Sequence, residues 1–206
     1  MAERLPKPPQ KFGIPPVLKT LRRGTRLWRV YFQGGGHPTQ WDACRNFGPT
    51  NGRFDHHTHP KRVQSRGIIY ATSGKQAILT AVAEVFQDTR HIDRFRAQPW
   101  LASFELDGPL QLLNTGANWP GQAGGNMAIN SGLRSRAREW SRRIYGQYPA
   151  VEGIWYPSCL TNQPCAALYE RATHALPSRP SLNLPLSHPS LLANLTQIAT
   201  RLNYTM

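Results

Sequence analysis

The chain has 206 residues, enough for one domain with a buried core. Hydrophobic residues make up 39% of it, with six Trp, seven Tyr and seven Phe, which excludes a disordered chain, and no run approaches the roughly 18 apolar residues of a membrane-spanning helix. A formal net charge of +14 indicates an anionic ligand or partner without choosing between nucleic acid, an acidic protein and a phosphate-bearing small molecule.

The first half of the chain predicts an extended arm, two strands and a helix. Residues 1–24, rich in Pro, Lys and Arg, indicate the arm, and a single domain is expected over residues 25–206. The sequence LWRVYF (27–32) favours a strand. The Gly-, Pro- and His-rich segment that follows predicts a long irregular region, and GIIYAT (67–72) a short buried strand. Ser73 is then the expected N-cap of a helix over residues 75–86.

The second half predicts further strands and two helices. Residues 100–114 look like one strand, or two broken at the Asp-Gly-Pro turn that starts at Asp107. A Gly-rich stretch leads to a basic amphipathic helix around residues 131–148. The remaining expected elements are a strand at 153–160, a strand bending into a turn at 165–172, and a C-terminal helix at 186–204. Strands and helices mix without a regular βαβ rhythm, which favours an α+β fold.

The cysteines and the first residues indicate a cytoplasmic protein. Cys44, Cys159 and Cys165 form no CxxC pair, and their odd number suits a reducing compartment. The first residues lack the apolar central region of a secretory signal.

Glu84 is the most informative candidate for chemistry. It is the single charge in the apolar run AILTAVAEVF, where a carboxylate is costly unless it is paired or lines a cavity. The competing reading is a solvated stripe of an amphipathic helix. Small neutral residues at three and four positions from Glu84, such as Thr80 and Ala81, weaken that reading.

Arg53, Arg29 and Tyr70 are weaker candidates. Arg53 follows Gly52 in a loop where a ligand can approach the backbone and a guanidinium can clamp a phosphate, although loop arginines are usually solvated. Arg29 lies in mid-strand and needs a partner. Tyr70 ends a strand just before the Glu84 helix, where an aromatic ring packs either on a ligand or in the core.

The remaining polar groups favour structural interpretations. Ser158 lies near a strand end without the GxSxG of a hydrolase. His56, His57 and His59 lack any metal-binding spacing, so an exposed polar loop is expected and no metal. The basic run from Arg134 to Arg143 is expected to be a solvated face.

Taken in order, five segments resemble the RES-domain family, the toxins of a class of bacterial toxin–antitoxin pairs. They are LWRVYF, NGRFDHH, GIIYATSGKQAILTAVAEVF, REWSRRIYGQYPAVEGIWYPSCL and CAALYERA, within about residues 25–175. The family is named for an Arg, a Glu and a Ser, which fall on Arg53 or Arg29, on Glu84 and on Ser158. Phe54 and Asp55 stand where the family usually has Trp and Asn, and residues before 25 are unmatched.

The resemblance implies a fold similar to that of ADP-ribosyltransferase toxins, a split antiparallel sheet that holds NAD as a substrate rather than a cofactor. It also implies cleavage of the nicotinamide–ribose bond by hydrolysis, phosphorolysis or ADP-ribosyl transfer. Glu84 would be the catalytic carboxylate, and Arg53, Tyr70 and Ser158 would be further catalytic residues. These three residues and Arg29 would contact NAD. A cognate antitoxin, commonly with a helix-turn-helix part that binds DNA, would block the site.

Two other classes of function stay open. The basic charge fits a nucleic-acid-binding protein, but no zinc, RRM or helix-turn-helix signature supports direct nucleic-acid binding. A catalytically inactive interaction module of the same fold is the second alternative, against which Glu84 and the two arginines argue.

Overall fold

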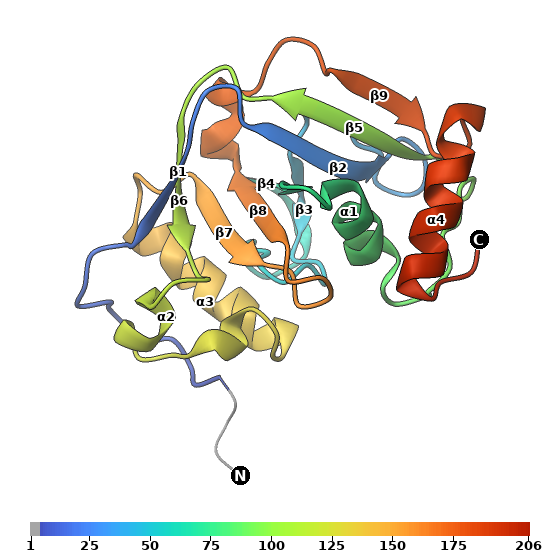
Figure 1. Cartoon of the computed structure of the whole chain (residues 1–206). Helices are drawn as coiled ribbons and strands as arrows, with labels where there is room; N and C mark the ends of the chain where they lie inside the picture. Colours follow the sequence, from blue (N-terminus) through green and yellow to red (C-terminus); the bar gives the residue numbers. More distant parts are fainter. Residues whose placement is uncertain (1–4) are drawn as a thin grey trace.

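The computed structural model describes residues 5–206 (Figure 1). In it, short amphipathic and apolar runs of sequence form one sheet of nine strands. The strands are β1 (Leu18–Leu21), β2 (Arg26–Phe32), β3 (Arg45–Gly48), β4 (Arg62–Thr72), β5 (Pro99–Glu105), β6 (Leu110–Asn114), β7 (Gly153–Pro157), β8 (Pro164–Tyr169) and β9 (Leu182–Pro185). Their order is β1-β6-β7-β8-β4-β2-β5-β9, with β3 paired to β4. The pairs are antiparallel except β6 with β7, which confirms an α+β fold with a mostly antiparallel sheet.

The sheet divides between β2 and β4. Within residues 5–206 their one register pair joins Trp28 to Thr72, whereas β2 pairs with β5 along its whole length. Figure 1 shows β2, β5 and β9 running in a different direction from β6, β7 and β8. The two halves therefore open at this junction, where side chains of both can face a common space.

Within the described part of the chain, four α-helices and three short 3-10 helices flank the sheet. They are α1 (Ala77–Phe86), α2 (Trp119–Gln122), η1 (Met127–Ile129), α3 (Arg134–Gln147), η2 (Glu170–Ala175), η3 (Pro189–Leu191) and α4 (Leu192–Leu202). Figure 1 shows α2 and α3 beside β6 and β7, and α1 and α4 beside β2 and β5. No helix within residues 5–206 has the length and apolar character needed to cross a membrane.

The buried apolar side chains of the described residues form three clusters, two of which include residues of the α-helices. Trp119, Trp140 and Phe54 pack under α3, and Val82 and Phe86 of α1 pack with apolar residues of β5 and α4. Since α1 is held on its apolar face by this second cluster, its other face is free to present Glu84 toward the junction of the sheet halves.

The N-terminal segment packs against this domain. Leu5 and Phe12 are buried in the same cluster as Trp140, Phe12 stacks on Trp140 with ring centroids 5.6 Å apart, and the indole of Trp140 donates to the carbonyl of Pro6 at 2.8 Å. β1 pairs with β6. The segment is extended, but the boundary expected at residue 24 does not separate it from the core.

Three expectations about local structure are wrong. The region between residues 33 and 66 is not irregular throughout, because it contains β3 and the first residues of β4. Ser73 does not cap α1; its hydroxyl donates to the carbonyl of Arg26 at 3.1 Å, and Gln76 occupies the N-cap without a side-chain hydrogen bond. β9 lies in a Pro-rich stretch for which no strand was expected.

Candidate active site

A cavity of about 580 Å³ lies at the junction of the two sheet halves. Its walls come from β2, β4, α1 and the loop around residue 52, with single residues from β7, β8 and α3. Four arginines and two carboxylates are the charged groups that line it: Arg29, Arg45, Arg53, Arg134, Glu84 and Asp88. The structure thus brings Arg29 of β2, Arg53 of the loop, Tyr70 of β4 and Glu84 of α1 to one cavity.

Glu84 is half-buried on α1, and a hydrogen bond from Ser158 holds its carboxylate in place. The hydroxyl of Ser158 donates to Oε1 of Glu84 at 2.6 Å. That hydroxyl in turn accepts from the backbone N–H groups of Leu160 at 3.1 Å and Thr161 at 3.3 Å. Since the hydroxyl has one proton, these bonds aim it at Glu84. Ser158 is almost fully buried and does not line the cavity itself, so in this geometry it positions the carboxylate.

Arg29 enters the cavity from a buried position on β2. Its Nη1 donates to the carbonyl of Trp41 at 2.9 Å, and its guanidinium lies 5.5 Å from the centre of the Tyr31 ring. Burial lowers the pKa of Arg29 to about 10, against the opposing charges of groups such as Cys44. The guanidinium is nevertheless protonated at neutral pH, and its Nε makes no hydrogen bond within the described residues. A buried cation with a free donor is suited to hold an anion.

Arg53 lines the cavity from the loop around residue 52 and is fixed there. Its Nη1 donates to the carbonyl of Gly132 at 2.7 Å, and its Nη2 lies 3.8 Å from the sulfur of Cys159. One edge of the guanidinium fork is therefore anchored to the protein. This anchoring is what a loop arginine needs in order to act as a clamp rather than a solvated charge.

Tyr70 contributes its ring to the wall and its hydroxyl to the loop that carries Arg53. The hydroxyl accepts from the backbone N–H of Phe54 at 3.1 Å, and burial raises the pKa of Tyr70 above its usual value. A Cβ at Gly52 would lie 2.7 Å from this hydroxyl, so glycine is required for the approach. Tyr70 therefore sets the distance between β4 and the Arg53 loop.

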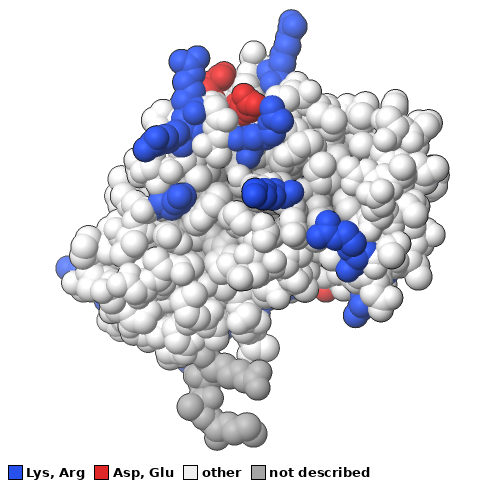
Figure 2. All heavy atoms as spheres, in the orientation of Figure 1, with Lys and Arg blue, Asp and Glu red and all other residues white. Residues whose placement is uncertain are grey.

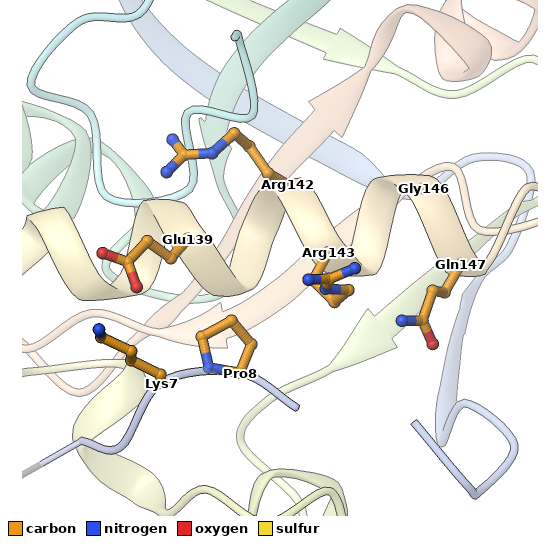
Figure 3. Close-up of a pocket in the computed structure, with 7 residues that line it drawn as sticks. All are labelled: Lys7, Pro8, Glu139, Arg142, Arg143, Gly146 and Gln147. Atoms are coloured by element: carbon orange, nitrogen blue, oxygen red, sulfur yellow. The ribbon is translucent and has the colours of Figure 1, made fainter. Parts of the chain in front are cut away.

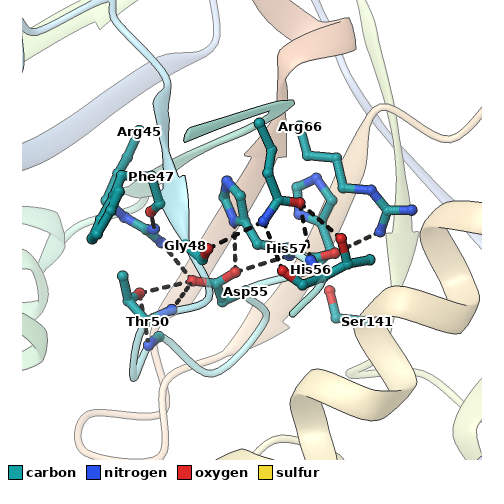
Figure 4. A network of polar contacts seen from close by, with 12 residues as sticks. Arg45, Phe47, Gly48, Thr50, Asp55, His56, His57, Arg66 and Ser141 are labelled. Carbon is teal, nitrogen blue, oxygen red and sulfur yellow. Dashed lines mark hydrogen bonds and ion pairs between the residues drawn. The ribbon is translucent and has the colours of Figure 1, made fainter. Parts of the chain in front are cut away.

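Asp55, a buried carboxylate that the sequence did not indicate as a functional residue, holds the same loop through several hydrogen bonds (Figure 4). Asp55 accepts from Arg45 at 2.9 Å, from the backbone and hydroxyl of Thr50, both at 2.7 Å, and from Nδ1 of His57 at 2.6 Å. Burial raises the pKa of Asp55, but the bond to His57 and the charge of Arg45 outweigh it and bring the pKa well below the usual range. Arg45 and Thr50 line the cavity, so Asp55 orders its wall.

The expectation of an exposed histidine loop is wrong for two of the three residues. His56 and His57 are fully buried. The bond from His57 to a carboxylate assigns its proton to Nδ1, and the ring of His56 stacks on Tyr145 with centroids 4.4 Å apart. The signal that could have shown this is the adjacent Asp55, a short acid able to satisfy a buried imidazole two residues away. Within residues 5–206 no group of three candidate ligands could hold a metal ion.

Glu170 completes the support beneath this loop. Its carboxylate accepts from the hydroxyl of Tyr145 and from the backbone N–H of Gly67 at 2.9 Å, and it lies 3.6 Å from Nε2 of His56. Burial raises the pKa of Glu170, but His56, Tyr145 and Gly67 together lower it from 4.5 to about 2. A lowered carboxyl pKa stabilises the fold above about pH 4.5, and this stability is lost as the pH falls toward 2.

Glu170→Gln should remove this pH-dependent stability. At about pH 7 the variant is expected to be less stable by roughly 1–3 kcal/mol, because an amide has one acceptor oxygen for two donors. Near pH 3 the wild type has lost part of the advantage and the difference should shrink. Urea unfolding at both pH values measures this. A difference that does not change with pH would mean that the charge of Glu170 plays no part.

Comparison with known proteins gives a fold but no close relative. No protein-family model and no curated protein matches the chain. Among solved structures, it is similar to a chain of the M. tuberculosis MbcT–MbcA toxin–antitoxin complex, with a TM-score of 0.58 and 16% identity over 86% of this chain and 92% of that chain. At this identity the likeness shows the fold, and the fold expected from the RES resemblance is confirmed.

Proposed function

We propose that the chain is the toxin of a bacterial toxin–antitoxin pair and that it degrades NAD by breaking the nicotinamide–ribose bond. The observation that carries the chemistry is the Glu84 carboxylate, held by Ser158 at the wall of a cavity lined by four arginines. The fold shared with a chain of a toxin–antitoxin complex supports the biological role.

The reaction needs a carboxylate near the ribose. As the bond to nicotinamide breaks, its electron pair leaves with nicotinamide and positive charge develops on the ribose carbon and ring oxygen. Glu84 stabilises this charge and accepts a proton from the attacking water, phosphate or protein side chain. Ser158 keeps the carboxylate in place, because its own proton is committed to Oε1. A preset charge of this kind costs no reorganisation at the moment of reaction.

The arginines suit the rest of the substrate. The guanidinium groups of Arg29 and Arg53 hold the pyrophosphate or ribose hydroxyls, and Arg45 and Arg134 add charge to the same cavity. Tyr70 offers a ring on which nicotinamide stacks. The second carboxylate, Asp88, lies 3.6 Å from Arg134 and is exposed, so Glu84 is the better placed acid.

The proposal is tested by incubating purified protein with NAD, with and without inorganic phosphate. The products are then identified by mass spectrometry. Nicotinamide must appear in every case. ADP-ribose indicates water as the acceptor, a phosphorylated ADP-ribose indicates phosphate, and a mass increase of the protein or of an added target indicates transfer. No nicotinamide from folded protein would reject the proposal and leave the nucleic-acid-binding or inactive-module interpretation.

A neutralising antitoxin is the proposed partner, in the cytoplasm, where the NAD pool lies. Figure 2 shows Lys and Arg side chains gathered on the upper and middle part of one face, with a few acidic side chains among the uppermost. An antitoxin with acidic residues would meet such a surface quickly, and the association would weaken with salt. A helix-turn-helix part of that antitoxin would supply DNA binding to the pair.

Arg53→Ala should weaken NAD binding by about tenfold or more, and Arg53→Lys by less, since lysine keeps the charge but loses the planar fork. Affinities are measured by calorimetry in a Glu84→Gln background, so that NAD is not consumed. Arg143→Ala, an exposed substitution outside this cavity, is the control. Equal affinities for all of these variants would place the Arg53 loop outside the binding site.

A further inference from the structure

Arg45 is a cavity arginine whose position is fixed by a buried carboxylate. It begins β3 and lines the cavity between the sheet halves. Its Nη2 donates to Asp55 at 2.9 Å, and its Nη1 donates to the carbonyl of Phe47. A guanidinium has further N–H donors beyond these two, and the side chain of Arg45 is 21% exposed. The protein thus anchors this cation and leaves donors for a ligand in the cavity.

The two carboxylate oxygens of Asp55 have separate tasks (Figure 4). Oδ1 accepts from the backbone N–H and from Nδ1 of His57, at 3.0 and 2.6 Å. Oδ2 accepts from Arg45 and from both the N–H and the hydroxyl of Thr50. The side chain of Asp55 is fully buried, so it cannot shift without breaking several of these bonds. The guanidinium that it holds is therefore preorganised.

Arg134 lines the same cavity but is held differently. Its ion-pair contact is to Asp88 at 3.6 Å, and the side chain of Asp88 is 76% exposed. An ion pair with an exposed partner contributes little and does little to fix either side chain. Replacing Arg45 or Arg134 by glutamine removes the same charge from the same cavity. The two variants therefore separate the effect of a fixed guanidinium from the effect of charge alone.

Cations also line a hollow of about 570 Å³ beside the N-terminal segment, and its lining residues differ from those of the main cavity. Figure 3 shows Lys7 and Pro8 of this segment passing beside α3, which carries Arg143. The acid of this hollow, Glu139, lies 2.6 Å from Arg136, and Arg143 is exposed. Arg143 therefore serves as a reference for the general charge of the protein.

We propose that Arg45 binds the pyrophosphate of NAD and that Asp55 is a positioning residue, which acts on this substrate through Arg45. A guanidinium with donors to spare suits a phosphate better than a ribose hydroxyl, because hydrogen bonds between charged groups are the stronger ones. The inference rests on the proposed function, since it assigns one part of that substrate to one wall of the cavity. The pyrophosphate does not react, so its contact is alike in the ground state and the transition state. Loss of the contact then raises KM and leaves kcat nearly unchanged.

Steady-state kinetics of nicotinamide release and calorimetry test this inference. The calorimetric probe is ADP-ribose, which keeps the pyrophosphate of NAD but lacks the bond to nicotinamide. Arg45→Gln and Asp55→Asn should each raise KM and weaken ADP-ribose binding by about tenfold, because each removes a charge-assisted contact to phosphate. Arg134→Gln and Arg143→Gln should change both quantities by less than about threefold, as expected for weakly held surface charges.

The double variant shows whether Asp55 acts through Arg45. In Asp55→Asn the amide oxygen keeps its bonds to His57, which turns the NH2 group toward Arg45, so that a donor faces a donor. Once Arg45 is replaced by glutamine, the change at Asp55 should add less than about twofold to KM. The same rise in KM with or without Arg45 would overturn the positioning role. If Asp55→Asn does not fold, Asp55→Ser, which is smaller and introduces no amide, takes its place.

Two further results would overturn the inference. Equal rises in KM for Arg45→Gln and Arg134→Gln would mean that charge alone attracts the substrate. A lower melting temperature of Arg45→Gln with unchanged affinity for ADP-ribose would mean that the pair with Asp55 only supports the fold. Nicotinamide release by the wild type decides the proposed function. The ADP-ribose affinities decide this inference even if no nicotinamide is released, so the two failures are distinct.

Discussion

Glu84→Gln is expected to lower NAD turnover by about a hundredfold or more while the fold stays intact. The amide has nearly the same shape, and its oxygen still accepts the proton of Ser158, so α1 keeps its contacts. The change removes the negative charge that the ribose needs as nicotinamide leaves, and effects of this type reach about 10²–10⁴-fold. Circular dichroism and a thermal melt establish the fold, and released nicotinamide measures the rate.

Ser158→Ala is the informative companion to this variant. It leaves the charge of Glu84 in place but removes the bond that fixes its position, so a smaller loss of kcat is expected than for Glu84→Gln. If the glutamine variant folds and keeps more than about a tenth of the wild-type rate, Glu84 is not the main electrostatic group of the reaction.

The sequence alone singled out Glu84 as a candidate, because a charge inside an apolar helix is unusual whatever surrounds it. The strand that carries Arg29 and the helix that carries Glu84 were predicted by alternation and by an apolar run, which are local signals. Ser158 was identified by resemblance alone. Its role behind Glu84 depends on a contact between residues 74 positions apart, and no local pattern describes such a contact.

The loop from Arg45 to His57 shows why the remainder could not be predicted. Its Gly, Pro and His content suggests solvent exposure, yet Asp55 and His57 are fully buried and share a hydrogen bond of 2.6 Å. Burial of a polar group is decided by its partners, and composition does not identify them. The same applies to Phe12, whose place between Trp119 and Trp140 depends on helices more than a hundred residues later.

Expression of the chain alone in a bacterium is expected to stop growth and to lower cellular NAD, and expression of the Glu84→Gln variant is expected to do neither. At a turnover of about 10 s⁻¹, ordinary for an enzyme, each molecule would cleave on the order of 10⁴ NAD within about twenty minutes. Even modest expression would then outpace synthesis. Growth and extracted NAD are followed together after induction, with equal soluble amounts of both proteins.

The order of the two events separates the mechanisms. If NAD degradation causes the arrest, NAD must fall before growth stops, because the arrest is a consequence of the depleted pool. Arrest at unchanged NAD would instead point to modification of one target protein or to nucleic-acid binding, since neither drains the pool. Absence of arrest from soluble, folded protein would favour an inert module. Glu84→Gln discriminates further: its surface charge differs by a single unit, so arrest that persists in this variant would arise from the basic surface and not from the carboxylate in the cavity.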